Sequence, residues 1–149
     1  MEIIQAQTQD ADEVGVLFDL YRQFYQQPAD LELAQDYISS RIAHEESIIY
    51  VAYEGEEAVG FVQLYPSFCS VQASKILVLY DLYVAAEHRK KGIGEALMNR
   101  ATALAKESGA ARLDLLTGKD NIPGQTLYEK LGYEKTNEDF FAYSLQVAS

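Results

Sequence analysis

The stretch Arg89-Lys90-Lys91-Gly92-Ile93-Gly94 stands between an apolar, strand-like run at 76–84 and a helical pattern at 94–106. A strand, a basic turn with glycine and a helix together form an anion cradle, because the first N–H groups of a helix point outward and carry partial positive charge. Glycine at 92 and 94 lets an anion approach the backbone with no side chain in the way. The pattern therefore predicts a phosphate-binding turn here.

Two common phosphate-binding patterns do not fit this turn. A dinucleotide fingerprint needs a third glycine three residues after the second, and that position is Leu97. A P-loop needs Gly-Lys-Ser/Thr, and the chain has Gly118-Lys119-Asp120 instead. What remains is Arg-x-x-Gly-x-Gly. This string resembles the acetyl-coenzyme A signature of the GNAT family of N-acetyltransferases, whose consensus is Gln/Arg-x-x-Gly-x-Gly/Ala.

A second segment supports this resemblance. Residues 121–133 read Asn-Ile-Pro-Gly-Gln-Thr-Leu-Tyr-Glu-Lys-Leu-Gly-Tyr, which is similar to the family's second signature, Asn-x-x-Ala-x-x-Leu-Tyr-x-x-x-Gly-Phe/Tyr. The match has Gly124 in place of the usual alanine. Upstream, Asp-Leu-Tyr-Val at 81–84 resembles the acidic-Leu-x-Val strand end of the family, with Ala86 replacing a frequent proline and Glu87 keeping the acid. The resemblance covers about half the chain, 76–145.

Length and composition fit one globular domain, 1–149. Of the 149 residues 48% are apolar, which predicts a sizeable core rather than disorder. No apolar run is long enough to span a bilayer and the first residues are not a signal peptide, so we expect no membrane association and a cytoplasmic protein. One cysteine, Cys69, and two histidines predict no disulfide and no metal site. The sequence is compatible with a homodimer and leaves the oligomeric state open.

The net charge of −11 predicts repulsion of nucleic acids. Positive residues gather around the two signatures, whereas acids are richest in the first half. The basic residues near the signatures are Arg89, Lys90, Lys91, Lys119 and Lys130. The asymmetry indicates either an anion site in the second half with an acidic surface in the first, or acids that only aid solubility.

Hydrophobic periodicity predicts the element order β α α β β β α β α β β. The predicted strands include 2–6, 48–53, 58–65, 74–84, 112–116, 133–135 and 140–146. The fold class is therefore α+β, an α/β sandwich-like arrangement with a mixed, mostly antiparallel central sheet of about seven strands flanked by four helices. The strand–helix–strand unit around Gly92 predicts a parallel pair with a right-handed crossover. The resemblance implies that the fourth and fifth strands splay apart around the cofactor.

The resemblance also implies acetyl-CoA as co-substrate and direct transfer to an amine. Backbone amides of 90–95 would hold the pyrophosphate, Leu82 and Val84 would bond the pantetheine arm as an added strand does, and Asn121 would contact the same arm. The implied cofactor-binding residues are Leu82, Val84, Arg89, Lys90, Lys91, Gly92, Gly94, Glu95, Asn121 and Tyr128.

Two proton transfers are needed, because the amine must lose a proton and the leaving thiolate must gain one. The resemblance implies Tyr128 as the general acid. Three candidates remain for the base: Asp81, Glu87 and an ordered water. Strand alternation predicts that Asp81 shares a face with Tyr83 and Leu79.

The acceptor is expected at a wall formed by the first two helices and the last two strands. This wall would carry Tyr21, Phe24, Tyr25, Asp30, Glu32, Phe140, Phe141 and Tyr143. Aromatic rings with acids suit a cation, and residues 137–143 resemble family members that acetylate small amines or polyamines. We expect a small cationic primary amine. A protein lysine or N-terminal amine, a non-catalytic acetyl-CoA sensor, a nucleotide-binding protein and acyl groups other than acetyl remain open.

Overall fold

The computed structural model describes residues 1–136 and 139–148. The chain divides into two compact units, Met1–Leu116 and Thr117–Ser149, and each is described by itself. The first unit contains β1 (Glu2–Gln5), η1 (Thr8–Asp10), α1 (Ala11–Phe24), α2 (Leu31–Ala43), β2 (Ile48–Glu54), β3 (Glu57–Cys69), β4 (Ser74–Val84), η2 (Ala86–His88), α3 (Ile93–Glu107) and β5 (Leu113–Leu115). The second contains α4 (Ile122–Lys130).

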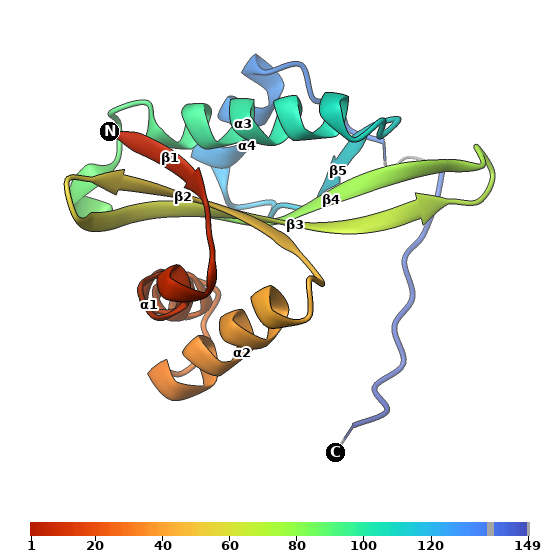
Figure 1. The fold of residues 1–149 in the computed structure, drawn as a ribbon. Coiled ribbons are helices and arrows are strands. Elements are labelled where there is room, and N and C mark those ends of the chain that lie inside the picture. The colour runs from red at the N-terminus through yellow and green to blue at the C-terminus, as the bar shows by residue number, and fades with distance from the viewer. Residues whose placement is uncertain (137–138, 149) are drawn as a thin grey trace. The chain divides into compact units, whose positions relative to one another are not determined.

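The sheet of the first unit has the order β1-β2-β3-β4-β5. Neighbours pair antiparallel except β4 and β5, which are parallel and joined by α3. Figure 1 shows α1 and α2 on one face of this sheet and α3 on the other. The predicted α+β class, mixed sheet and four helices are confirmed. None of the helices in the described part of the chain combines the length and apolar character needed to cross a bilayer.

The predicted count of seven strands is wrong, because the sheet has five. The segments 133–136 and 139–148, which hold the two remaining predicted strands, contain no strand. The side chains of Phe141, Tyr143 and Leu145 alternate as in a strand but are 85–91% exposed. Alternation makes a segment suited to a sheet, yet a strand forms only where a neighbour satisfies its backbone groups.

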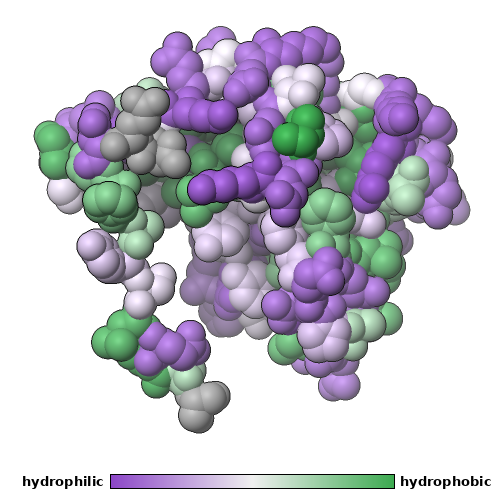
Figure 2. Space-filling view, turned by 180° about the vertical axis from the view of Figure 1, so that it is seen from behind, coloured by the Kyte–Doolittle hydropathy of each residue, from purple (hydrophilic) through white to green (hydrophobic). Residues whose placement is uncertain are grey.

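Apolar side chains fill both faces of the sheet. Phe61 and Ile38 lie in the cluster between β3 and the helices α1 and α2, with Val14, Leu17 and Phe18 of α1. On the other face, α3 contacts β2, β3 and β4 and buries Leu97 and Met98 completely. The surface is mostly hydrophilic in the view from behind, with apolar residues in separate groups (Figure 2).

A β-bulge in β4 changes which residues share a face. Gln63 pairs with Asp81 and Leu64 pairs with Leu79, so Tyr80 is an extra residue without a partner in β3. Because Gln63 and Leu64 are adjacent and point to opposite faces, Asp81 and Leu79 do so too. The predicted shared face of Asp81 and Leu79 is therefore wrong, since a bulge interrupts strand alternation.

Candidate active site

The turn after β4 has the backbone of an anion cradle. Lys90 and Gly92 both adopt left-handed conformations, with φ of 63° and 83°, and Gly92 is the residue that precedes the first turn of α3. A left-handed conformation strains a non-glycine residue by about 1–3 kcal/mol and is typical of ligand-binding turns. A Cβ added at Gly92 would meet no atom within 4 Å, so the space before the helix N-terminus is open. The turn therefore fits a phosphate group.

The three basic residues of the turn have two roles. Arg89 donates from Nε to the carbonyl of Val84 at 2.8 Å, and its guanidinium lies 5.2 Å from the Tyr83 ring centroid. Arg89 thus ties the turn to the end of β4. Lys90 and Lys91 are exposed and supply positive charge beside the open space.

Among the described residues, the second half of β4 has no partner strand on the side of β5. β5 pairs only with Leu77–Leu79, and no strand in the described part of the chain pairs with 80–84 on that side. Because Ala85 donates to Val59 of β3 at 2.8 Å, antiparallel alternation turns the backbone groups of Leu82 and Val84 toward the unpaired edge. The Val84 carbonyl is engaged by Arg89. An extended ligand arm could still bond to the Val84 N–H and to both groups of Leu82.

Asp81 lies at the bulge and is buried, with 4% exposure. Its Oδ2 accepts a hydrogen bond from Gln63 Nε2 at 2.6 Å. Burial raises the pKa of Asp81 above that of an ordinary carboxyl, while hydrogen bonds from Gln63 and Tyr21 oppose the rise. A buried carboxylate with a raised pKa is suited to accept a proton. Glu87, the other predicted acid, is exposed in η2.

Aromatic residues of α1 lie on the same face of the sheet as Asp81. The Tyr21 hydroxyl donates to the carbonyl of Tyr80 at the bulge, at 3.1 Å, and its ring packs against Tyr25 and Tyr83 at centroid distances of 5.1 and 6.4 Å. Phe24 packs on Tyr25 at 5.3 Å. The helix thus brings the predicted aromatic residues of 21–25 together.

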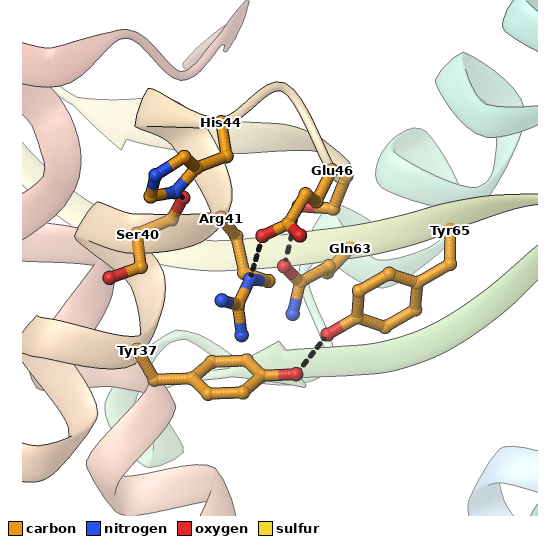
Figure 3. A network of polar contacts seen from close by, with 8 residues as sticks. Tyr37, Ser40, Arg41, His44, Glu46, Gln63 and Tyr65 are labelled. Atoms are coloured by element: carbon orange, nitrogen blue, oxygen red, sulfur yellow. Dashed lines mark hydrogen bonds and ion pairs between the residues drawn. The ribbon is translucent and has the colours of Figure 1, made fainter.

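A second polar group joins α2 to β3. The hydroxyls of Tyr37 and Tyr65 lie 2.6 Å apart, and Figure 3 shows them pointing toward each other from the helix and the strand. Arg41 lies 4.4 Å over the Tyr37 ring and bonds Glu46 at 2.9 Å, so its charge is compensated.

The remaining wall residues are not gathered at one place in the first unit. Asp30 caps the N-terminus of α2 and accepts from the N–H of Leu33, and Glu32 is exposed in the first turn of that helix. The aromatic residues of 140–143 are exposed and belong to the second unit. Of the segment 137–143, residues 137 and 138 lie outside the described residues.

In the second unit, Asn121 caps α4. Its side chain accepts from the Gly124 N–H at 3.1 Å and donates to Thr117 at 3.2 Å. A Cβ at position 124 would lie 2.5 Å from Asn121 Nδ2, so an alanine there would require the Asn121 side chain to shift. Tyr128 is buried on α4, with its ring centroid 6.1 Å from that of Tyr133.

Sequence reasoning missed two groups at the site. Gln63 is fully buried, and its Oε1 accepts from the Ser47 hydroxyl at 2.7 Å; a polar residue inside the apolar run 58–65 was a visible signal. The extra residue Tyr80 carries no such signal. The described residues bring no three His, Cys, Asp or Glu side chains together as ligands for a metal ion.

Asp81→Asn is expected to raise the melting temperature at pH 7. A raised carboxyl pKa means that the folded state disfavours the ionised form of Asp81. The ionised Asp81 therefore lowers the stability of the wild-type protein fully at pH values above its folded-state pKa, and this loss of stability disappears at pH values below its unfolded-state pKa. The gain should therefore shrink as pH falls through the raised pKa. Thermal denaturation from pH 3 to 8 measures it, with the exposed Asp36→Asn as control. A lower melting temperature for Asp81→Asn at pH 7 would contradict the expected sign.

Comparisons with known proteins agree on one family. A family model described as the acetyltransferase (GNAT) family matches residues 15–133. The uncharacterized N-acetyltransferase YhfO of Bacillus subtilis (strain 168) is 42% identical over 147 residues, which cover 99% of this chain and 98% of that protein. A crystal structure of a probable acetyltransferase has a TM-score of 0.90 at 35% identity, covering 100% of this chain and 99% of the other. The aminoglycoside N-acetyltransferase AAC(6')-Iy in complex with CoA shares the fold, with a TM-score of 0.82, 16% identity and coverage of 96% and 93%.

Proposed function

This chain belongs to the acetyltransferase (GNAT) family and is an N-acetyltransferase, and we propose that it transfers the acetyl group of acetyl-CoA directly to a primary amine of a small cationic molecule such as a polyamine. The observation that carries the proposal is that, in the described part of the chain, one edge of β4 is unpaired between the bulge and the end of the strand. Its unpaired edge runs from the buried Asp81 at the bulge to the anion cradle at Gly92.

The cradle and the edge divide the binding of acetyl-CoA between them. The amides of 90–95 and the charges of Lys90 and Lys91 hold the pyrophosphate, and the backbone of Leu82 with the N–H of Val84 holds the arm. Asn121 keeps the start of α4 folded through its cap, and the family signature assigns it to the same arm. Acetyl-CoA supplies the reactive thioester when bound. Backbone N–H groups at the β4 edge are suited to stabilise negative charge that develops on its oxygen.

The two proton transfers fall to Asp81 and Tyr128. Asp81 accepts the proton that the amine must lose, because a carboxylate with a raised pKa is a stronger base than an ordinary one. Tyr128 donates a proton to the leaving sulfur. The amine reaches Asp81 from the face of the sheet that carries α1 and α2, where the Tyr21 hydroxyl donates to the carbonyl of the bulged residue Tyr80.

Direct transfer is supported by the position of the only cysteine. Cys69 pairs with Ser74 at the far end of the β3–β4 hairpin, whereas Gln63 pairs with Asp81. Six residues of strand separate Cys69 from Gln63, which is about 20 Å. An acyl-enzyme on Cys69 would therefore form far from the base.

A cationic acceptor is supported by the aromatic rings of α1 beside the bulge, which offer cation–π contacts. Arg41 of α2 is paired with Glu46 and adds no net positive charge. Asp30 and Glu32 at the start of α2 do not lie at the bulge, but their negative charge attracts a cation over a longer range. Each favourable charge contact contributes about 1 kcal/mol in water, roughly fivefold in kcat/KM. Cationic amines should therefore exceed neutral or anionic acceptors by about that factor or more.

A panel of acceptors tests this proposal by detection of released thiol. It spans polyamines, amino acids, aminoglycosides, aryl amines and lysine peptides. We expect transfer to small cationic amines, with kcat/KM that rises with pH as Asp81 ionises and falls with salt because surface attraction is screened. Glu32→Gln should lower kcat/KM for these acceptors, whereas Glu56→Gln in the β2–β3 turn should not.

Two results would speak against parts of the proposal. Efficient transfer to anionic or neutral acceptors, with cations inert, would reject the cationic acceptor and leave the family unchanged. Preference for lysine peptides would instead identify a protein acetyltransferase. Tight acetyl-CoA binding without transfer to any amine would identify a sensor.

A further inference from the structure

Ser47, Gln63 and Asp81 form a row of side chains joined by hydrogen bonds, which runs from the partly buried Ser47 to the buried Asp81. Ser47 Oγ donates to Gln63 Oε1 at 2.7 Å, and Gln63 Nε2 donates to Asp81 Oδ2 at 2.6 Å. Gln63 is 0% exposed, and Figure 3 shows it on β3, in the space between the strand and α2. A fully buried amide with both ends bonded is held in one orientation.

The row has a direction. Because the Ser47 proton goes to Gln63 Oε1, the amide Nε2 is turned toward Asp81. The Gln63 N–H group donates to the Asp81 carboxyl at 2.6 Å. This hydrogen bond favours the ionised form of Asp81, because an ionised carboxylate accepts hydrogen bonds at both of its oxygens. One carboxylate oxygen, Oδ2, is thereby fixed, which leaves Oδ1 for another partner.

We propose that Gln63 and Ser47 are positioning residues that keep the Asp81 carboxylate ionised and in one orientation for the incoming amine. The inference rests on the proposed function, in which Asp81 is the base. Burial alone would make Asp81 hold its proton up to a higher pH and so reduce the ionised fraction under working conditions. The Gln63 donor opposes this effect, so the row sets the pH at which the site becomes active.

Other groups that face Asp81 do not replace this donor. Tyr21 of α1 also bonds to Asp81, but its single hydroxyl proton is shared with the Tyr80 carbonyl, which lies 3.1 Å from the hydroxyl oxygen. Tyr65 of β3 lies near Asp81, but burial and the Tyr37 hydroxyl raise its pKa well above the ordinary value, so it stays neutral. Behind it on α2, the Arg41 charge is paired with Glu46.

Gln63→Met tests the row, because methionine nearly matches glutamine in size and lacks the donor. We expect the ascending limb of the kcat–pH profile to move up by about one pH unit, and turnover on the acidic side of that limb to fall roughly tenfold. Acetyl-CoA affinity should be unchanged. Ser47→Ala should shift the limb less, because Ser47 lines a pocket of about 210 Å³ where a water can replace the hydroxyl. Ser47→Thr keeps the hydroxyl and should restore the wild-type profile.

The matched control is Gln35→Met, which removes a glutamine donor to the backbone of Asp12 on α1 and should leave the profile in place. Titration of the Asp81 carboxyl by carbon NMR gives a readout that needs no turnover. A Gln63→Met protein whose Asp81 titrates as in the wild type overturns the inference, as does an equal loss of turnover at every pH. If the wild type acetylated no amine, the proposed function would fail, while the titration would still decide the role of Gln63.

Discussion

Gly94→Glu is expected to weaken acetyl-CoA binding by roughly ten- to a thousandfold while the protein stays folded. Gly94 is the second residue of α3, so the new side chain would project where the pyrophosphate meets the helix N-terminus. Two unit charges about 4 Å apart repel by about 1–4 kcal/mol near a protein surface, and each 1.4 kcal/mol is a tenfold change in affinity.

The free protein should tolerate this change. Gly94 does not adopt a left-handed conformation, a glutamate is a better helix former than glycine, and an acid in the first turn of a helix is favourable. Stability without ligand should therefore hold or rise while affinity falls. Gly92→Glu is a less clean variant, because its φ of 83° would add backbone strain.

Gly94→Gln is the matched control, since it has the same size and no charge. Calorimetry with CoA and acetyl-CoA at two salt concentrations measures both variants. The Glu variant should bind more weakly than the Gln variant, and the gap should narrow at high salt. Equal affinities in both variants and the wild type would mean that the phosphates lie elsewhere.

Local signals account for what the sequence predicted well. The β4–α3–β5 unit follows from an apolar run, a turn with Gly92 and a helical period, all within about forty residues, and each signal depends on near neighbours only. The helix α4 likewise begins at a local signal, because Pro123 lies in its first turn, where the missing N–H is harmless.

Properties set by distant partners were not predictable in this way. The bulge at Tyr80 exists because β4 has one residue more than β3 at this point of their pairing. The sequence of neither strand taken alone indicates this extra residue. Gln63 meets Ser47 and Asp81 across 16 and 18 residues of sequence, so its role depends on strand register. The segment 140–146 has the alternation of a strand, yet pairing depends on a neighbour that alternation does not specify.

Tyr128→Phe is expected to lower kcat by about 10²- to 10⁴-fold, the typical contribution of one well-placed proton donor, with a much smaller change in acetyl-CoA affinity. The substitution keeps the ring that packs on α4 near Tyr133 and removes only the hydroxyl. An interaction needed only when the thiolate leaves should lower kcat and kcat/KM equally.

Tyr133→Phe is the natural control for Tyr128. Its ring lies beside that of Tyr128, and the family signature accepts Phe or Tyr at this position, so loss of its hydroxyl should change kcat little. Steady-state kinetics by thiol release, with affinity measured separately by calorimetry, separates proton donation from binding. A loss confined to affinity would make Tyr128 a binding residue, and unchanged kinetics would make it a residue of the α4 core. Because leaving-group protonation is independent of Gln63, the Tyr128→Phe and Gln63→Met losses should multiply in the double variant.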